Sequence, residues 1–385
     1  MLNFEFHNPT RIVFGQGKVA DLARLVPAQA RVLVLYGGES ARRTGTLDEV
    51  RAALGERSVS EFGGIEPNPS YETLMRAVEQ VRAEHIDYLL AVGGGSVIDG
   101  TKFVAAAACF DGEPWDILLQ RGRNVQRALP LASVLTLPAT GSEMNNGGVV
   151  TRKATQAKLS FSSVHCFPQF SVLDPTKTYT LPPAQIANGL VDAYVHVMEQ
   201  YLTYPVQARP QDRFAEGLLQ TLVEIAPGAL AEPPDFHHRA NLMWTATLAL
   251  NGLIGAGVPQ DWATHMIGHE LTALYGIDHA RTLAIVLPSL MQSQRAAKRD
   301  KLLQYAERVW HVSGGTEDER IDAAITHTRA FFESVGIPTR LSAYGLGREA
   351  VDAVVAQLTA HGMLKLGEHR SITPEVSRAI LEAAL

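Results

Sequence analysis

The sequence is poor in cysteine, in basic clusters and in long apolar runs. Its 385 residues include two cysteines, Cys109 and Cys166, and neither stands in a CxxC pair, which excludes a disulfide framework and a cysteine-based zinc or redox centre. It has no run of about 18 apolar residues that would span a bilayer. It also has no Lys/Arg run that would mark a nucleic-acid or anionic-membrane partner. Because Met1–Phe14 lacks the basic start and apolar core of a signal peptide, we expect a cytoplasmic protein that binds neither nucleic acid nor membrane.

Apolar residues, in contrast, are plentiful. Hydrophobic residues make up 46% of the chain and charged residues 19%, a balance typical of a globular protein with a sizeable core and not of a disordered chain. The 34 basic and 40 acidic residues are spread along the sequence and give a net charge of −6. At roughly 100–200 residues per domain, this length predicts two or three domains, of which two is the simpler division.

Up to about residue 180, short apolar segments alternate with amphipathic or alanine-rich ones. Arg31–Tyr36 and Asp87–Val92 are apolar almost throughout, as strands covered on both faces are. Such alternation is typical of a doubly wound parallel sheet in an α/β domain. The predicted strands are Arg31–Tyr36, Ser58–Phe62, Asp87–Val92, Pro130–Leu137 and Gln169–Leu173, with a polar hairpin over Gly147–Ser163. The predicted helices are Lys18–Leu25, Thr46–Leu54, Tyr71–His85 and Val97–Cys109.

After Pro182-Pro183 the pattern becomes helical and stays so to the last residue. Glycine, proline and polar clusters separate the helical segments. The sequence therefore predicts an α/β domain over residues 1–180 and an all-α domain over residues 181–385, with a ligand in the cleft between them. The predicted helices are Ala184–Thr203, Gln211–Ile225, His238–Leu253, Asp261–Leu274, His279–Lys298, Lys301–Val312, Glu317–Val335, Arg348–Ala360 and Pro374–Leu385.

A glycine-rich turn, Gly93-Gly94-Gly95-Ser96, follows a predicted strand and opens a predicted helix. The free N–H groups and the dipole of a helix N-terminus favour a phosphate there, and glycine lets the backbone approach it closely. The turn contains neither G-x-G-x-x-G nor a complete P-loop. It therefore predicts phosphate binding without naming the ligand, and the alternative is a plain tight turn.

A second glycine turn, Gly37-Gly38-Glu39-Ser40, follows the first strong strand. NAD-binding sheets commonly carry at this strand end an acid that holds the adenosine ribose. Here glycine occupies the strand end, and Ser40, Arg42 and Arg43 follow it, so these residues are candidates to accept a 2′-phosphate. The alternative is a solvated turn without a ligand.

Two segments pair a histidine with a partner at helical spacing, and one further histidine stands at a predicted helix start. Asp192 and His196 are four residues apart, as are His265 and His269, so each pair shares one face of its helix. His279 follows a predicted helix break at Gly276, with Asp278 as the expected N-cap. One carboxylate with several imidazoles suits zinc, Fe(II) or a similar divalent ion, although the spacing leaves open which three or four atoms are ligands. No G-x-S-x-G elbow or activated cysteine offers a nucleophile instead.

With these motifs the chain resembles the iron-dependent (group III) alcohol dehydrogenases from end to end, and within them most closely the NADPH-dependent, broad-range aldehyde reductases. The shared motifs are Gly93–Ser96 with Asp99 and Lys102, Glu66–Pro69, Thr136–Glu143, Asp192-x3-His196, and His265-x3-His269 followed by His279. Glu39 departs from the pattern, since it stands where these reductases have a further glycine, and a carboxylate there repels a 2′-phosphate.

The resemblance implies a dehydroquinate synthase-like fold with a dinucleotide-binding α/β domain, a helical metal-binding domain and a homodimer. It implies that Asp192, His196, His265 and His279 bind one divalent metal, Fe2+ or Zn2+, and that His269 lines the substrate side. The cofactor would be NADP(H). Its expected contacts are Gly94, Gly95, Ser96, Asp99, Asn68, Thr136, Thr140, Ser142 and Lys158, beside the Gly37, Gly38 and Ser40 turn.

The implied activity is the reversible reduction of aldehydes to primary alcohols. A metal- and NAD-dependent lyase or cyclase of the dehydroquinate synthase type is an alternative, but it requires basic residues around the metal to hold a phosphorylated acid. The predicted helices with Asp192 and His265 are nearly free of Lys and Arg, which argues against it. A catalytically silent metal- or nucleotide-binding regulator is a second alternative, and the full set of expected ligand residues argues against that.

Overall fold

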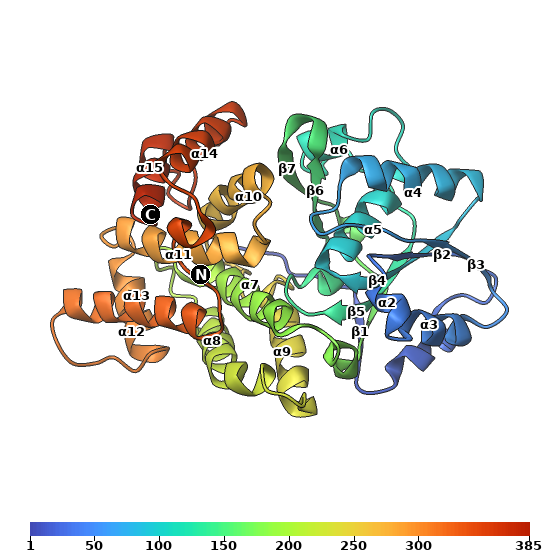
Figure 1. Cartoon of the computed structure of the whole chain (residues 1–385), viewed down its shortest axis with the longest axis horizontal. Coiled ribbons are helices and arrows are strands. Elements are labelled where there is room, and N and C mark those ends of the chain that lie inside the picture. The colour runs from blue at the N-terminus through green and yellow to red at the C-terminus, as the bar shows by residue number, and fades with distance from the viewer. The chain divides into compact units, whose positions relative to one another are not determined.

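The strands of the first half form one parallel sheet. The computed structural model describes all 385 residues, and its six-stranded sheet has the order β1-β8-β5-β4-β2-β3 with every neighbouring pair parallel (Figure 1). The predicted doubly wound α/β fold is thus confirmed. The strands are β1 Arg11–Phe14, β2 Arg31–Tyr36, β3 Ser58–Phe62, β4 Tyr88–Gly94, β5 Leu131–Leu137 and β8 Phe170–Leu173. The edge strand β1 was not predicted.

The sheet is covered on both faces, and β2 shows why its sequence is apolar throughout. Val32 and Val34 belong to one apolar cluster, together with residues of helices α1 (Leu22–Leu25) and α3 (Thr46–Leu54). Leu33 and Leu35 point to the opposite face and belong to a second cluster with residues of α4 (Tyr71–Ala83) and α5 (Gly95–Ala108). Because successive side chains of a strand face opposite ways, a strand buried on both sides needs apolar residues at every position.

Shorter elements complete this half. Strands β6 (Gly147–Arg152) and β7 (Ala157–Ser162) pair antiparallel, which confirms the predicted hairpin. The residues after Gly38 form the single-turn helix α2 (Ser40–Arg43) where we had predicted a turn. Helix α6 covers Asp116–Leu119.

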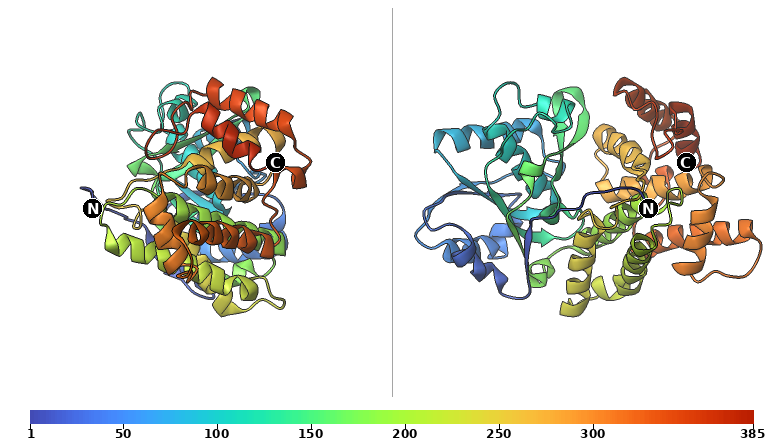
Figure 2. Two further views of the ribbon diagram at one scale, coloured as in Figure 1. Left: turned by 90° about the vertical axis from the view of Figure 1, so that its left-hand side faces the viewer. Right: turned by 180° about the vertical axis from the view of Figure 1, so that it is seen from behind.

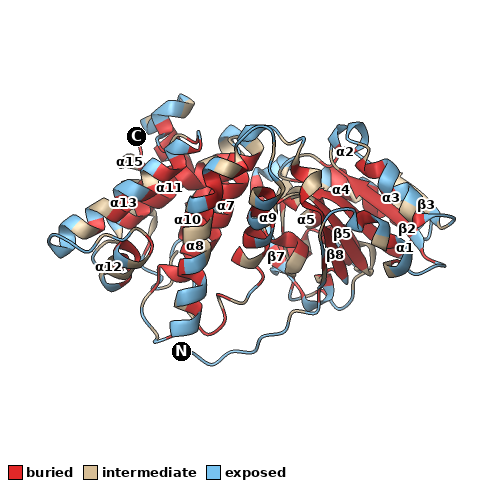
Figure 3. Cartoon of the chain, turned by 90° about the horizontal axis from the view of Figure 1, so that it is seen from below, coloured by how far each residue is buried: buried red, intermediate tan, exposed pale blue.

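The second half is helical, as predicted. Figure 2 shows its helices from two further sides. The helices are α7 Pro183–Tyr201, α8 Arg209–Ala229, α9 Phe236–Ala249, α10 Ala263–Tyr275, α11 His279–Ser293, α12 Arg299–Arg308, α13 Glu317–Ser334, α14 Arg348–Ala360 and α15 Pro374–Glu382. Helix α7 is buried at every position from Ile186 to Tyr201, whereas α12 and α13 carry exposed residues on one side (Figure 3). A helix that is apolar all round packs at the centre of its domain, so polar residues on α7 require a specific reason.

By its contacts the chain forms two compact units. The α/β unit comprises His7–Pro182 and Pro234–Thr247, and the helical unit comprises Met1–Phe6, Pro183–Pro233 and Leu248–Leu385. Most of α9 therefore belongs to the α/β unit. None of the helices has both the length and the apolar character needed to cross a membrane.

Candidate functional site

Three helices of the helical unit bring one carboxylate and four imidazoles together. Asp192 and His196 lie on α7, His265 and His269 on α10, and His279 is the first residue of α11. Oδ1 of Asp192 lies 3.6 Å from Nε2 of His196 and 3.7 Å from Nε2 of His279. The ring centroid of His265 lies 4.8 Å from that of His196 and 5.3 Å from that of His279. The ring centroids of His269 and His279 are 5.1 Å apart.

This cluster fits a divalent metal ion. Ligand atoms of Asp192, His265 and His279 all lie within 4.8 Å of one another. Nε2 of His196 lies near the Asp192 member of this group, 3.6 Å from its Oδ1. Ligands about 2.0–2.2 Å from a shared tetrahedral ion stand about 3.3–3.6 Å apart, close to the separations measured around Asp192. Oδ1 of Asp192 is buried and receives no hydrogen bond, and a buried acceptor of this kind is rare unless a ligand satisfies it.

The local sequence explains how the helices present these side chains. Gly276 ends α10 in the left-handed region at φ 68°, so the chain turns sharply before His279. Asp278 holds the N-cap position of α11, as predicted, but its side chain makes no capping hydrogen bond. Nδ2 of Asn188, one turn before Asp192, instead donates to Oδ2 of Asp278 at 3.1 Å. This bond ties the turn before His279 to α7.

Two residues that sequence reasoning did not assign to the site, Glu199 and Trp262, contact His265, and a third, Lys298, supports the segment before it. Oε1 of Glu199 lies 2.9 Å from the backbone N of His265 and 3.0 Å from its Nδ1. The indole of Trp262 packs edge-on against the His265 ring, with centroids 5.1 Å apart, and its backbone is left-handed at φ 65°, which is uncommon for a bulky residue. Lys298, almost fully buried, binds Asp261 at 2.7 Å. Only Glu199 had a local signal, since it lies seven residues after Asp192 on the same helix.

Lys298 is charged despite its burial. Its Nζ donates to Oε1 of Glu368 at 2.7 Å and to the carbonyl of Leu202 at 2.7 Å, in addition to its bond with Asp261. Burial by itself would lower the pKa of Lys298, but the carboxylates of Asp261 and Glu368 outweigh it and raise that pKa above its usual value. The ammonium therefore holds the segment that leads into α10.

In the α/β unit, the glycine turn joins β4 directly to α5. A Cβ on Gly93 would lie 2.5 Å from Val97, and one on Gly95 would lie 2.4 Å from the side chain of Thr140. Real Cβ atoms do not come this close, so these positions require glycine for packing within the protein. The N-terminus of α5, at Gly94 and Gly95, is thus left without side chains that would cover its backbone N–H groups.

Behind this turn lies a buried polar network. Oγ of Ser142 donates to Oδ1 of Asp99 at 2.5 Å, and Nζ of Lys102 donates to Oγ of Ser142 at 2.8 Å. Lys102 also donates to Oδ1 of Asn145 and to the carbonyl of Gly147, so all three of its protons are used. Burial lowers the pKa of Lys102 to about 8 and raises the pKa of Asp99. The fully buried Lys102 supports the hairpin beside α5.

The remaining cofactor candidates of this unit lie around the same turn. Nζ of Lys158 donates to Oδ1 of Asn68 at 2.8 Å, and the backbone N–H of Asn68 donates to Oγ of Ser96 at 3.3 Å. Thr136, near the end of β5, and Thr140, just beyond it, are half-buried. The structure therefore brings together most of the predicted cofactor contacts: Gly94, Gly95, Ser96, Asp99, Asn68, Thr140, Ser142 and Lys158.

The Gly37–Ser40 turn lies next to the same helix. A Cβ on Gly37 would lie 3.5 Å from Cγ2 of Val97, whereas one on Gly38 would meet nothing within 4 Å. Arg42, which sequence reasoning offered as a phosphate partner, donates to Oη of Tyr36 at 2.5 Å and lies 3.9 Å from Glu39. Ser40 and Arg43 are exposed.

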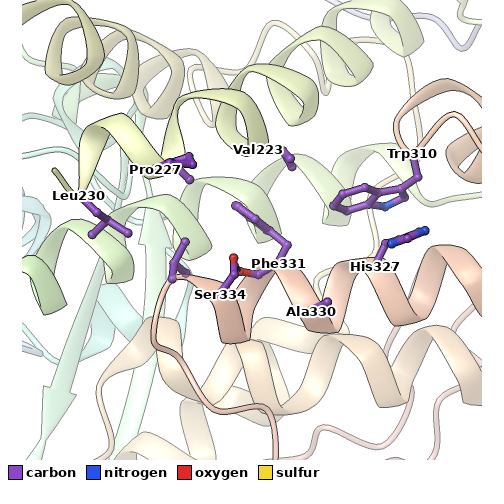
Figure 4. A pocket seen from close by; sticks show the side chains of 10 residues that line it. Val223, Pro227, Leu230, Trp310, His327, Ala330, Phe331 and Ser334 are labelled. Carbon is purple, nitrogen blue, oxygen red and sulfur yellow. Dashed lines mark hydrogen bonds between the residues drawn. The ribbon is translucent and has the colours of Figure 1, made fainter.

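A separate pocket of the helical unit contains none of these residues. Side chains of α8 and α13 line a cavity of about 380 Å³, and Trp310 stacks on His327 at one end of it (Figure 4). Its lining is mainly apolar and includes none of the carboxylate and imidazole groups of the histidine cluster.

The fold and the site define a class: a two-part α/β and helical enzyme scaffold with a carboxylate–histidine cluster that fits a divalent metal ion. Residues 9–175 match the family described as iron-containing alcohol dehydrogenase, and residues 186–385 match the C-terminal part of the Fe-containing alcohol dehydrogenase family. The chain belongs to the iron-containing alcohol dehydrogenase family.

Individual relatives agree with this assignment. The chain is 60% identical over 386 residues to the NADPH-dependent aldehyde reductase YqhD of Escherichia coli, with 100% of both chains covered. It is 40% identical to the probable NADH-dependent butanol dehydrogenase 1 of Bacillus subtilis, again over 100% of both chains. Among solved structures, the crystal structure of E. coli YqhD matches with a TM-score of 0.99 over 100% of this chain and 99% of that chain. The NADH-dependent butanol dehydrogenase A of Thermotoga maritima matches with a TM-score of 0.96 at 34% identity, covering 100% of this chain and 99% of that one.

Proposed function

We propose that this protein is a metal-dependent oxidoreductase that reduces aldehydes to primary alcohols with NADPH, and that the reaction is reversible. One observation carries the proposal: the buried carboxylate of Asp192 faces His196 and His279 at 3.6 and 3.7 Å, in a chain 60% identical over its full length to an NADPH-dependent aldehyde reductase. The substrate is a small aldehyde or alcohol.

The metal ligands in this proposal are Asp192, His196, His265 and His279. A divalent ion, Fe2+ or Zn2+, supplies a Lewis acid that polarises a carbonyl oxygen and stabilises negative charge on it. The protein contributes by preorganising the four ligand side chains close together in the absence of the ion. Asp192, His196 and His265 are almost fully buried, which keeps competing water away from the donors.

His269 has a different role from the other histidines. It lies one helical turn after His265, its ring is 6.2 Å from the His265 ring, and it is almost fully buried. Four donors complete a metal site without it, so its imidazole is not needed as a ligand and instead holds the proton that the product hydroxyl group requires. An imidazole suits this role because its pKa lies close to neutral pH.

The α/β unit binds NADP(H) in this proposal, and the cofactor supplies the hydride. Backbone N–H groups at the N-terminus of α5 hold the pyrophosphate, with Gly94, Gly95 and Ser96 leaving them accessible. Lys158, held by Asn68, adds a positive charge beside the turn. Asp99, Thr136, Thr140 and Ser142 shape the rest of the cofactor site.

A preference for NADPH over NADH follows from the end of β2. Positions 37 and 38 are glycine and not an acidic residue, so the 2′ position of the adenosine ribose meets no carboxylate from them. Glu39 in this turn opposes a phosphate, and the guanidinium of Arg42, 3.9 Å away, partly offsets its charge. Ser40 and Arg43 are exposed and available to a phosphate, to which charged donors bind more strongly than neutral ones.

We further propose that the protein is cytoplasmic and that it forms a homodimer, of which the family resemblance implies the latter. The dehydroquinate synthase-type alternative loses its basis because both halves of the chain match alcohol dehydrogenase families. A silent regulator would have no need to keep every proposed ligand.

An assay of NADPH oxidation over a series of aldehydes, with metal analysis of the purified protein, tests the proposal. We expect oxidation with several aldehydes by protein that contains one metal ion per chain. Absence of NADPH oxidation with every aldehyde of the series would refute the proposed activity.

A further inference from the structure

Glu199 shares one face of α7 with two of the proposed metal ligands. Asp192, His196 and Glu199 occupy positions i, i+4 and i+7, which align along one side of a helix. The Glu199 side chain is buried. It does not point to the carboxylate of Asp192 but reaches across to α10, where Oε1 contacts His265 twice, through the backbone N at 2.9 Å and through Nδ1 at 3.0 Å.

These two contacts determine which nitrogen of His265 carries the proton. A backbone N–H can only donate, so Oε1 of Glu199 acts as an acceptor for it. The same oxygen then accepts the second hydrogen bond from Nδ1–H, since a carboxylate oxygen has lone pairs for both. The neutral imidazole of His265 is therefore protonated on Nδ1, and its lone pair lies on Nε2, the atom left to bind a metal.

We propose that Glu199 is a positioning residue of the metal centre, which fixes the tautomer and orientation of His265 and strengthens Nε2 as a ligand. The inference rests on the metal centre of the proposed function. A carboxylate hydrogen-bonded to the non-ligating nitrogen of a histidine raises the basicity of the ligating one, and loss of such a partner typically weakens metal binding about 10–100-fold.

The surroundings of Glu199 hold it in this position. Its main-chain carbonyl accepts the N–H of Asp261 at 2.9 Å. Oδ1 of Asp261 in turn accepts the N–H of Ala263 at 2.9 Å, and Oδ2 binds the ammonium of Lys298. The start of α10 is thus tied to the end of α7 by main-chain and ionic bonds that do not involve the Glu199 carboxylate. Changing that carboxylate leaves these ties in place.

The chain provides a matched control in Glu270. This residue is also a buried glutamate, and its Oε1 lies 2.8 Å from Nδ1 of His361. The pair shares the contact between Oε1 and Nδ1 with Glu199 and His265, and Glu270 lies on the same helix as His265. His361, however, is not part of the histidine cluster, so a purely structural effect of changing a buried glutamate beside a histidine appears in both variants and a metal effect in only one.

The test is a titration of the metal-free full-length protein with Co2+ in competition with a chelator of known affinity, for the unmodified protein, Glu199→Gln and Glu270→Gln. Glutamine retains an acceptor oxygen for both N–H groups but cannot ionise, so it is a weaker acceptor than a carboxylate. We expect Glu199→Gln to bind Co2+ at least tenfold more weakly, and Glu270→Gln to bind it as the unmodified protein does. Equal affinity of all three proteins would overturn the role of Glu199, as would equal weakening in both variants. If the unmodified protein binds no Co2+, the proposed metal centre itself is wrong.

A measurement on the unmodified protein keeps the inference testable if Glu199→Gln does not fold. Nitrogen-15 NMR of the histidine-labelled, metal-free protein distinguishes the two neutral tautomers, and the spectrum of His265→Gln identifies the His265 signals. We expect protonation on Nδ1. Protonation on Nε2 would overturn the inference.

Discussion

Oδ1 of Asp192 lies 3.7 Å from Nε2 of His279, although α8, α9 and α10 separate the two residues along the chain. The sequence places Asp192 beside His196 through helical spacing alone, but it cannot place His279. The sharp turn at Gly276 and the bond from Asn188 to Asp278 bring His279 to the carboxylate. This convergence is the basis for treating the cluster as a metal centre.

We expect His265→Ala and His279→Ala each to lower both metal content and reductase activity, because each removes one of four donors. Metal content after dialysis against a chelator and NADPH oxidation with an aldehyde are the two measurements. His237→Ala, which changes an exposed histidine of α9, serves as the control and should change neither. A variant that retains one metal ion per chain after dialysis would show that its histidine is not a ligand.

We expect His269→Ala to keep its metal but to lose turnover. His269 stands one turn from His265 but is surplus to a four-donor site, so its removal takes away the proton donor and leaves the ion in place. A loss on the order of 100-fold in kcat is the usual scale for a missing general acid. Metal analysis and kcat are measured on the same sample. If metal and activity disappear together, His269 is a ligand and the separation of roles is wrong.

We expect kcat/KM for NADPH to exceed that for NADH by roughly ten- to a hundredfold, since one charge-assisted bond contributes about 1.5–3 kcal/mol. Gly38→Asp should shift the preference toward NADH, because the new carboxylate enters open space beside β2 and repels a 2′-phosphate. Glu39→Gln should shift it the other way. Equal kcat/KM for both cofactors in the unmodified protein, or a preference for NADH, would contradict the assignment.

Lys102 predicts a pH dependence of stability. Burial lowers its pKa from an ordinary value of 10.5 to about 8. Between these two pH values the unfolded chain retains the proton and the folded protein has lost it, so the free energy of unfolding rises with pH. Relative to Lys102→Met, the unmodified protein should gain about 1.4 kcal/mol per pH unit in this range. Denaturant unfolding of both proteins at pH 7, 8, 9 and 10 measures the difference, and a constant difference would contradict the shifted pKa.

The sheet could be predicted because its central strands are buried on both faces and are therefore apolar at nearly every position. Val32 and Leu33 face opposite sides of β2, and both sides are buried, so the segment is apolar without interruption. The edge strand β1 gave no such signal, because only Val13 of its four residues is buried and both end residues, Arg11 and Phe14, are exposed. Helix α2 was also not predicted, because a helix of one turn that follows two glycines has the amino-acid composition of a loop.

Only those parts of the site that depend on the spacing of residues within one helix could be predicted. The pairs Asp192–His196 and His265–His269 are visible as four-residue spacings. The contacts of Glu199 with His265 and of Lys298 with Asp261 join helices far apart in the chain, and no spacing in the sequence encodes them. The left-handed backbone of Trp262, which turns its indole against His265, has no sequence signature either.

We expect turnover to depend on an ion held by the cluster around Asp192. To test this, a chelator strips the metal from the purified protein, and NADPH oxidation with one aldehyde is then measured as Fe2+ or Zn2+ is added back. We expect the stripped protein to be inactive, and its activity to return and to reach a plateau at one ion per chain. Full activity in protein shown by metal analysis to be free of metal would contradict this expectation.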